Sequence, residues 1–179
     1  MGSIIVVYDK NAESVSYRLN DIINKHKKYK DEFQVVRWDE KTWRNNRVTS
    51  QGELSGIIIF LGKIQGVNEI IKVSDVVFNE HYVTCYKSGN YLVISAKSNL
   101  LRKSKEKYDS FINDLNKIAD NRIKKANHGF AKVKAFMKNG IREMKMERDN
   151  IETQQLLYGA TMIVNQGILD SYLAGDKYD

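Results

Sequence analysis

Apolar residues occur as short unbroken runs in the first part of the chain and at helical spacing in the last part. The runs Ile4–Tyr8 and Ile57–Leu61 are rich in β-branched side chains and are closed by polar residues or by a glycine. Such runs indicate strands that are buried on both faces of a sheet. We therefore expect Ile58 and Ile59 to be inaccessible to solvent, on opposite faces that are each covered by helices.

The chain between these two runs predicts a helix, a strand and a loop. Apolar residues at helical spacing form one face of the helix, namely Val15, Leu19, Ile22, Ile23 and His26. The run Phe33–Trp38 alternates in part and predicts an edge strand. The polar segment Asp39–Gln51 predicts a loop with room for one helical turn. Its aromatic and basic residues could stack on a base or grip a phosphate, or Trp43 could pin the loop to the body of the protein.

A β-hairpin is predicted beyond the central run. Gln65–Val73 indicates a short helix or turn, and Asp75–Phe78 indicates a short strand. His81–Tyr86 and Tyr91–Ala96 flank a turn that contains glycine and asparagine, which is the pattern of a hairpin. Cys85 lies inside the first of these strands, where a lone cysteine is usually a small buried hydrophobe.

From about Leu100 the apolar period becomes helical. The last helix, roughly Ile151 to Leu173, is apolar around most of its circumference, so we expect it to pack on several surfaces at once. One such surface could belong to a second copy in a two-fold dimer, with Leu157, Met162, Ile168 and Tyr172 at the interface. We expect an α/β domain over residues 1–99 and a C-terminal helical region over residues 100–179 packed on it, and the two can form one structural unit.

Composition and charge narrow the function classes. The chain has 179 residues, one cysteine and a net charge of +7. Between Arg102 and Arg148 there are 14 Lys+Arg against 6 Asp+Glu, a net of +8, which leaves 15 against 16, or −1, for the remainder. No apolar run resembles a signal peptide or a membrane span, so we expect a soluble cytoplasmic protein.

The basic segment Arg102–Arg148 has several interpretations. It could contact nucleic acid, an anionic membrane or an acidic partner, or it could be a solvated helix face. No nucleic-acid recognition signature accompanies the charge, so we expect nucleic-acid binding to be at most weak and sensitive to salt.

The order strand, helix, strand, strand predicts an open, mostly parallel sheet. Ligands bind beyond the carboxyl ends of the strands in such sheets, so the candidate ligand-binding residues are Asp9, Trp38, Asp39, Gly62 and Lys63. The Gly-Lys pair could hold a phosphate through backbone donors, or the strand could simply end at the glycine.

The acidic residues of this edge, and the histidines and cysteine of the chain, bear on metal binding and acid–base chemistry. Asp9, Asp39 and Glu40 follow strands, so their carboxylates could converge to bind a metal or to act as acid and base. No histidine or cysteine pair has the spacing of metal ligands, and we expect no metal site from that source.

Three segments, IIVVYDKNAESVSYRL, VVRWDEKTW and SGIIIFLGK, resemble the first three strands and following loops of flavodoxin-like and TIR-like domains. The resemblance extends to Lys63. It implies an open α/β sheet, and for a TIR enzyme that cleaves NAD it implies a catalytic glutamate on the helix after the third strand. Glu69 is the positional candidate and Glu80 a more distant one. The serine or cysteine that usually precedes this glutamate is absent here, and the hairpin also departs from the family pattern.

Three functions follow from these observations. The first is a non-enzymatic interaction or regulatory module without a cofactor, which self-associates or docks a protein partner through its C-terminal helices. The alternative is a TIR-like enzyme that binds or cleaves NAD or another nucleotide at the carboxyl edge of the sheet. A weak basic nucleic-acid binder is a third reading.

Overall fold

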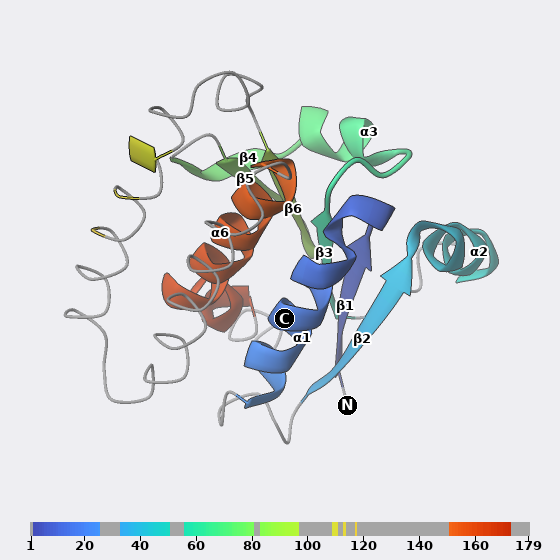
Figure 1. Ribbon diagram of the computed structural model, residues 1–179. Helices are drawn as coiled ribbons and strands as arrows, with labels where there is room; N and C mark the ends of the chain where they lie inside the picture. The colour runs from blue at the N-terminus through green and yellow to red at the C-terminus, as the bar shows by residue number, and fades with distance from the viewer. Residues whose placement is uncertain are drawn as a thin grey trace.

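The computed structural model describes residues 2–25, 33–50, 56–80, 83–96, 109–110, 113, 117 and 151–172. The elements of these residues are β1 (Gly2–Tyr8), η1 (Lys10–Ala12), α1 (Glu13–Lys25), β2 (Phe33–Asp39), α2 (Glu40–Ser50), β3 (Ile57–Leu61), α3 (Val67–Lys72), β4 (Asp75–Glu80), β5 (Val83–Ser88), β6 (Tyr91–Ala96) and α6 (Ile151–Asn165) (Figure 1). Except for residues 109, 110, 113 and 117, the helices expected between Leu100 and Met146 lie outside the described residues.

The strands form one six-stranded mixed sheet in the order β2-β1-β3-β6-β5-β4. Neighbouring strands from β2 to β6 run parallel, whereas β5 is antiparallel to both β6 and β4. The α/β class and the mostly parallel sheet are confirmed. The predicted hairpin is also confirmed as β5 and β6, joined by a two-residue turn at Gly89 and Asn90. It extends to a three-stranded meander, because the chain crosses from β3 to the far edge and returns to β3 through β5 and β6.

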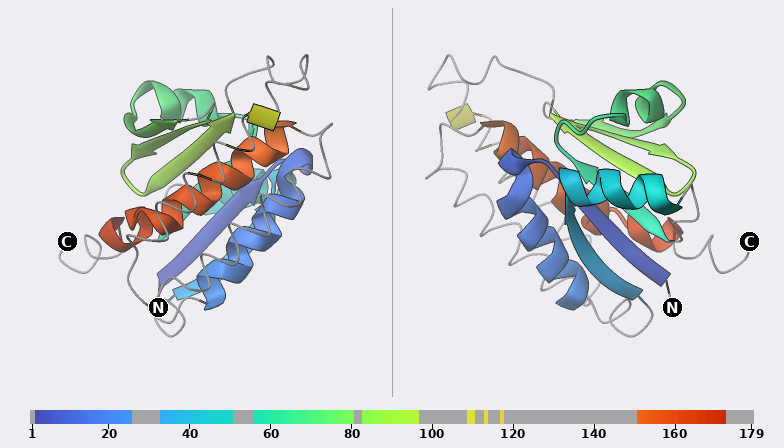
Figure 2. Two further views of the ribbon diagram at one scale, coloured as in Figure 1. Left: turned by 60° about the vertical axis from the view of Figure 1, so that its left-hand side comes forward. Right: turned by 90° about the vertical axis from the view of Figure 1, so that its right-hand side faces the viewer.

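Helices cover both faces of the sheet (Figure 2). α1 and α6 pack on one face together with Ile59, and α2 and α3 pack on the other together with Ile58. Both isoleucines are 0% exposed, which confirms the prediction that β3 is buried on both sides. β3 occupies the middle of the sheet because the apolar side chains on both of its faces are stable only when they are covered.

α6 is part of the main core. Its Leu157, Met162 and Ile168 are buried in the same cluster as β3 and β6, and Tyr172 is half-buried against that cluster. Three of the four side chains expected at a dimer interface are therefore already covered within the chain. Self-association stays a prediction, but these three side chains offer little surface to a second copy.

The prediction of a loop over Asp39–Gln51 is wrong in its main feature, because residues 40–50 form α2. Asp39 caps this helix by accepting a hydrogen bond from the backbone N–H of Thr42 at 2.7 Å. Trp43 is 2% exposed and lies edge-on against Phe60, with ring centroids 5.1 Å apart. Among the side chains of residues 40–47, Trp43 is the buried one, so this part of α2 has no apolar stripe of the kind that periodicity analysis requires. Trp43 pins this segment to the sheet, as one of the two interpretations expected.

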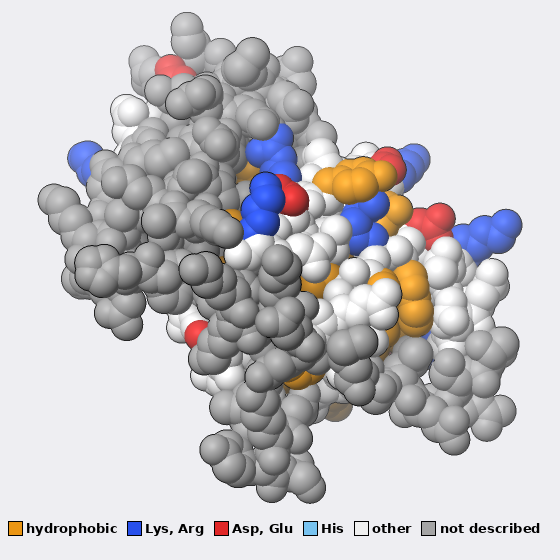
Figure 3. All heavy atoms as spheres, turned by 90° about the horizontal axis from the view of Figure 1, so that it is seen from below, with side chains coloured by type: hydrophobic (Ala, Val, Ile, Leu, Met, Phe, Trp, Pro, Cys, Tyr) orange, Lys and Arg blue, Asp and Glu red, His pale blue; other side chains and the backbone are white. Residues whose placement is uncertain are grey.

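Exposed apolar side chains are scattered over the described surface. Large examples are Tyr17, Val73 and Val76, and the view from below shows apolar patches separated by polar atoms (Figure 3). Isolated exposed hydrophobic residues are normal for a folded domain. Within the described residues, no helix has the length and hydrophobicity needed to cross a membrane.

The closest approach of α6 to the sheet occurs at Gly159, and this generates a prediction. A Cβ atom there would lie 2.5 Å from Cγ2 of Ile94 and 2.9 Å from Cγ2 of Val83. In an open helix, Gly→Ala stabilises by about 1 kcal/mol. Here we expect Gly159→Ala to destabilise the protein by about 1–3 kcal/mol, because the extra methyl group overpacks the core. Urea unfolding measures the difference.

The matched background for this test is Ile94→Leu, which moves the branch point away from Cβ at nearly constant volume. The cost of Gly159→Ala should shrink in that background, because the two sites are in contact. An equal cost in both backgrounds would show that the helix does not approach the sheet at this point.

Candidate functional site

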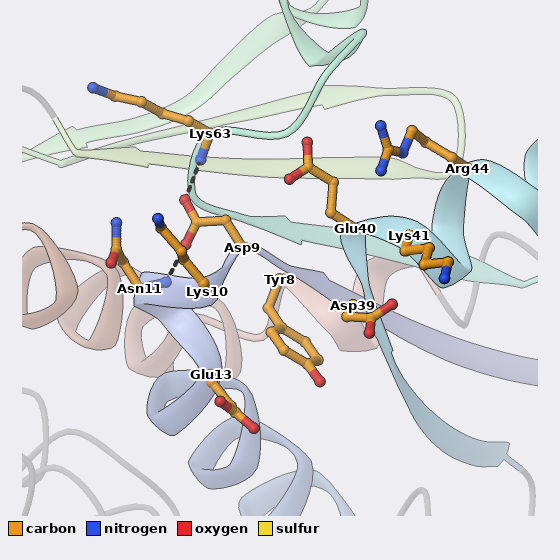
Figure 4. Close-up of a pocket in the computed structure, with 10 residues that line it drawn as sticks. All are labelled: Tyr8, Asp9, Lys10, Asn11, Glu13, Asp39, Glu40, Lys41, Arg44 and Lys63. Carbon is orange, nitrogen blue, oxygen red and sulfur yellow. Dashed lines mark hydrogen bonds between the residues drawn. The ribbon is translucent and has the colours of Figure 1, made fainter.

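The carboxyl ends of β1, β2 and β3 surround an open pocket of about 620 Å³ (Figure 4). Its walls also include η1 and the first residues of α1 and α2. The lining residues are Tyr8, Asp9, Lys10, Asn11, Glu13, Asp39, Glu40, Lys41, Arg44 and Lys63. The pocket lies where α/β sheets of this kind bind their ligands.

Asp9 fastens three backbone segments together. Its Oδ1 accepts hydrogen bonds from the backbone N–H groups of Asn11 at 2.9 Å and Ala12 at 3.0 Å, and its Oδ2 accepts one from Lys63 at 2.9 Å. The carboxylate thus caps η1 and ties the end of β1 to the loop that follows β3. The backbone donor of Lys63, one of those expected to hold a phosphate, is already engaged by this side chain.

Gly62 makes this arrangement possible. Its φ of +99° lies in the region that favours glycine. A Cβ atom at this position would lie 2.4 Å from Oδ2 of Asp9. The glycine is therefore required by the approach of the Asp9 carboxylate. The glycine accommodates the internal Asp9 carboxylate, and phosphate binding by the Gly-Lys pair stays a prediction.

The other two strand-end carboxylates also accept backbone hydrogen bonds. Hydrogen bonds from the side chain and the backbone of Thr42 hold the pKa of Asp39 below its ordinary value of 3.8. Oε1 of Glu40 accepts a hydrogen bond from the backbone N–H of Gln65 at 3.1 Å. Asp9 and Glu40 therefore tether the loop at residues 62–66 from two sides.

Tyr8 forms the half-buried part of the pocket wall. Burial raises the pKa of its hydroxyl, and the nearby charges of Glu13 and Asp39 add to the increase, whereas Arg37 opposes it. The guanidinium carbon of Arg37 lies 4.9 Å from the centre of the Tyr8 ring and 3.2 Å from that of Tyr17. Nε of Arg37 also donates to Oγ of Ser16 at 2.9 Å. The Arg37 guanidinium packs over the face of the Tyr8 ring and so fixes the position of this side chain.

Four cationic side chains line the pocket, on Lys10, Lys41, Arg44 and Lys63. Nζ of Lys63 lies 4.0 Å from Oε1 of Glu152, but its side chain is 88% exposed. Such exposed pairs contribute little to stability. The described residues include no cluster of histidine, cysteine, aspartate and glutamate side chains suited to a metal ion.

Three of the five predicted ligand-binding residues line the pocket: Asp9, Asp39 and Lys63. Gly62 lies against Asp9. Half-buried Trp38 packs instead against the core cluster on the α2 and α3 side of the sheet, where its ring centroid lies 6.5 Å from that of Trp43. Glu69 is exposed on α3 and does not line the pocket.

Sequence reasoning did not single out Tyr8 or Lys10. It offered the basic residues of Asp39–Gln51, which include Lys41 and Arg44, for gripping a phosphate, but placed them in a loop. The signal for Lys41 and Arg44 was their spacing of three residues, which places both on one side of a helix only if α2 is recognised. Elsewhere, Cys85 is a buried core residue as expected, and burial raises the pKa of its thiol to about 12.

Comparison with models of protein families, with curated proteins and with solved structures finds no match for this chain.

The hydrogen bonds of Asp9 generate a prediction about stability. Asp9→Asn keeps the size of the side chain but replaces one acceptor oxygen with a donor, so at least one backbone N–H loses its partner. We expect a loss of about 0.5–1.5 kcal/mol in the free energy of unfolding, the net contribution of one hydrogen bond, because water reaches the donors of Asn11 and Lys63. Urea titration at neutral pH measures it.

Glu13→Gln is the control for charge, because it removes a negative charge from the same pocket at an exposed position. Its effect should be within about 0.5 kcal/mol. Equal losses in the two variants would mean that the charge, and not the hydrogen bonding of Asp9, stabilises the fold.

Proposed function

We propose that this protein is a non-enzymatic interaction or regulatory module. The observation that carries the proposal is the use made of the carboxylates at the parallel strand ends. Asp9, Asp39 and Glu40 all accept hydrogen bonds from backbone N–H groups and hold loops in place. An acid or base in catalysis needs its oxygens directed at a substrate. Each of these three groups commits at least one oxygen to the scaffold, which supports a role in presenting a surface.

The surface that we propose is supplied by the basic segment Arg102–Arg148. Its net charge of +8, against −1 for the rest of the chain, favours a partner with an acidic surface. Lys138, Arg142 and Lys145 share one face if this part of the chain is helical. The buried side chains of α6 support the core, so we assign docking to the basic segment and not to α6.

This proposal predicts salt-sensitive binding to an acidic polypeptide. Poly-glutamate on a biosensor surface serves as the probe, and the triple variant Lys138→Glu, Arg142→Glu and Lys145→Glu tests the face. We expect the full chain to bind at low salt, with binding weakened at physiological ionic strength because exposed charges are then screened. The triple variant should lose most of the signal.

The control carries three charge reversals outside the segment, at Lys25, Lys72 and Lys87, which are exposed. Equal loss in the control would show that only net charge matters. Tighter binding to double-stranded DNA than to poly-glutamate, persisting at physiological salt with a base preference, would favour the nucleic-acid reading. Sedimentation of the same samples at several concentrations tests self-association separately.

A second candidate function is a TIR-like or flavodoxin-like protein that binds or cleaves a nucleotide such as NAD. It is favoured by the order β2-β1-β3, which matches the first three strands of the flavodoxin-like order. The pocket at their carboxyl ends supports it as well. The antiparallel meander of β4, β5 and β6 departs from that order, and Glu69 lies outside the pocket lining.

Incubation with NAD separates the two candidates. We expect no consumption of NAD by the full chain, because no glutamate on α3 lines the pocket. Chromatography of the reaction mixture measures NAD and nicotinamide. Release of nicotinamide that disappears in Glu69→Gln, but not in the neighbouring Asn68→Asp, would favour the enzyme and contradict the first proposal.

A further inference from the structure

The pocket at the strand ends has a volume within the range of small-molecule sites, and it is open and lined mainly by charged residues. Its volume of about 620 Å³ is typical of ligand cavities. Its walls come from the ends of three strands and the starts of two helices, and the hydrogen bonds of Asp9 and Glu40 hold the loop after β3 in position. A wall that is already held in position loses little conformational entropy when a ligand binds.

The lining has equal numbers of acidic and basic residues, but the acidic and the basic side chains differ in the interactions that they form within the protein. Asp9, Asp39 and Glu40 accept backbone hydrogen bonds, which offset part of their negative charge. Within the described part of the chain, Lys10, Lys41 and Arg44 form no ion pair. The cations are thus available to an anion from solution.

The place of that anion follows from the position of Asp9. In many α/β proteins a phosphate binds at the first helix N-terminus. Here the Asp9 carboxylate accepts the N–H groups of Asn11 and Ala12 and that of Lys63, so a phosphate would meet a carboxylate at this point. The uncommitted cations of α2, Lys41 and Arg44, lie on the other side of the pocket (Figure 4). Arginine can form two parallel hydrogen bonds to a phosphate there.

Two groups that can bind hydroxyls, Tyr8 and Asp39, are paired in register at the ends of β1 and β2, and Asp39 directly precedes α2. Asp39 uses Oδ1 to cap α2, and a carboxylate has further lone pairs that accept from a ligand hydroxyl. The Tyr8 side chain points between Glu13 and Asp39 (Figure 4). A tyrosine phenol is protonated at neutral pH, so the Tyr8 hydroxyl can donate a hydrogen bond. The two groups for hydroxyls thus adjoin the cationic side chains of α2 within one cavity.

We propose that this pocket binds a small phosphate ester that carries free hydroxyl groups, with the phosphate on Arg44 and Lys41 and the hydroxyls on Asp39 and Tyr8. The inference is independent of the interaction module and rests on the pocket of the second candidate function. It requires no turnover of the ligand. Failure of NAD cleavage therefore leaves it intact, and binding of a phosphate ester without cleavage leaves the interaction module intact.

The experiment compares three probes by isothermal titration calorimetry with the full chain: inorganic phosphate, ribose and ribose 5-phosphate. We expect ribose 5-phosphate to bind about tenfold more tightly than phosphate, the factor that corresponds to one good polar contact, and ribose alone to give no signal. Arg44→Ala should weaken both phosphate-containing probes by about tenfold, because it removes a charge-assisted pair of hydrogen bonds.

Asp39→Asn separates the two halves of the site. Asparagine also caps helices well, so the variant should fold. It should lower the affinity for ribose 5-phosphate toward that of phosphate without weakening phosphate itself. The matched control is Lys87→Ala, at an exposed position on β5, which should bind all probes as the unmodified protein does. No binding of ribose 5-phosphate, or an equal loss in Arg44→Ala and Lys87→Ala, would overturn the proposal.

Discussion

The complete burial of β3 is the constraint on which the rest of the structure depends. All five of its residues are 0% exposed, so apolar side chains point from both faces of the strand into covered space. The main chain can satisfy its hydrogen bonds only by pairing with β1 and β6. The side chains need a helical layer on each face. α1 supplies part of one layer and α2 and α3 form the other, and α6 returns from the end of the chain to complete the first.

The need for α6 explains its unusual composition. It packs against β5, β6 and α1, so almost every described side chain between Gln155 and Val164 is buried. An apolar circumference can therefore arise from several contacts inside one chain, without a second copy. Sequence periodicity cannot distinguish these cases, because it reports how much of a helix is apolar and not which surface covers it.

Other parts of the fold followed directly from the sequence, and their physical basis explains why. β1, β3, β5 and β6 are short runs with strong β preference, and their type is determined locally. Within residues 40–47 of α2 the buried side chain is that of Trp43, and one such residue leaves no periodic signal. The position of β4 beyond β5 is set by pairing between distant segments, so no local pattern reveals it. The stack of Arg37 on Tyr8 likewise depends on the parallel register of β1 and β2.

The candidate site shows the same division between local chemistry and register. A polar residue after a buried parallel strand can be located from sequence, and Asp9, Asp39 and Lys63 do meet around one pocket. What each residue does there depends on the neighbouring strand end. Asp9 lies beside Gly62 because β1 pairs with β3, and only then does its carboxylate take the backbone donor of Lys63. With that donor occupied, the proposed phosphate is assigned to the side chains of α2. The bond that stabilises the edge of the sheet therefore also determines which part of the pocket is free to recognise a ligand.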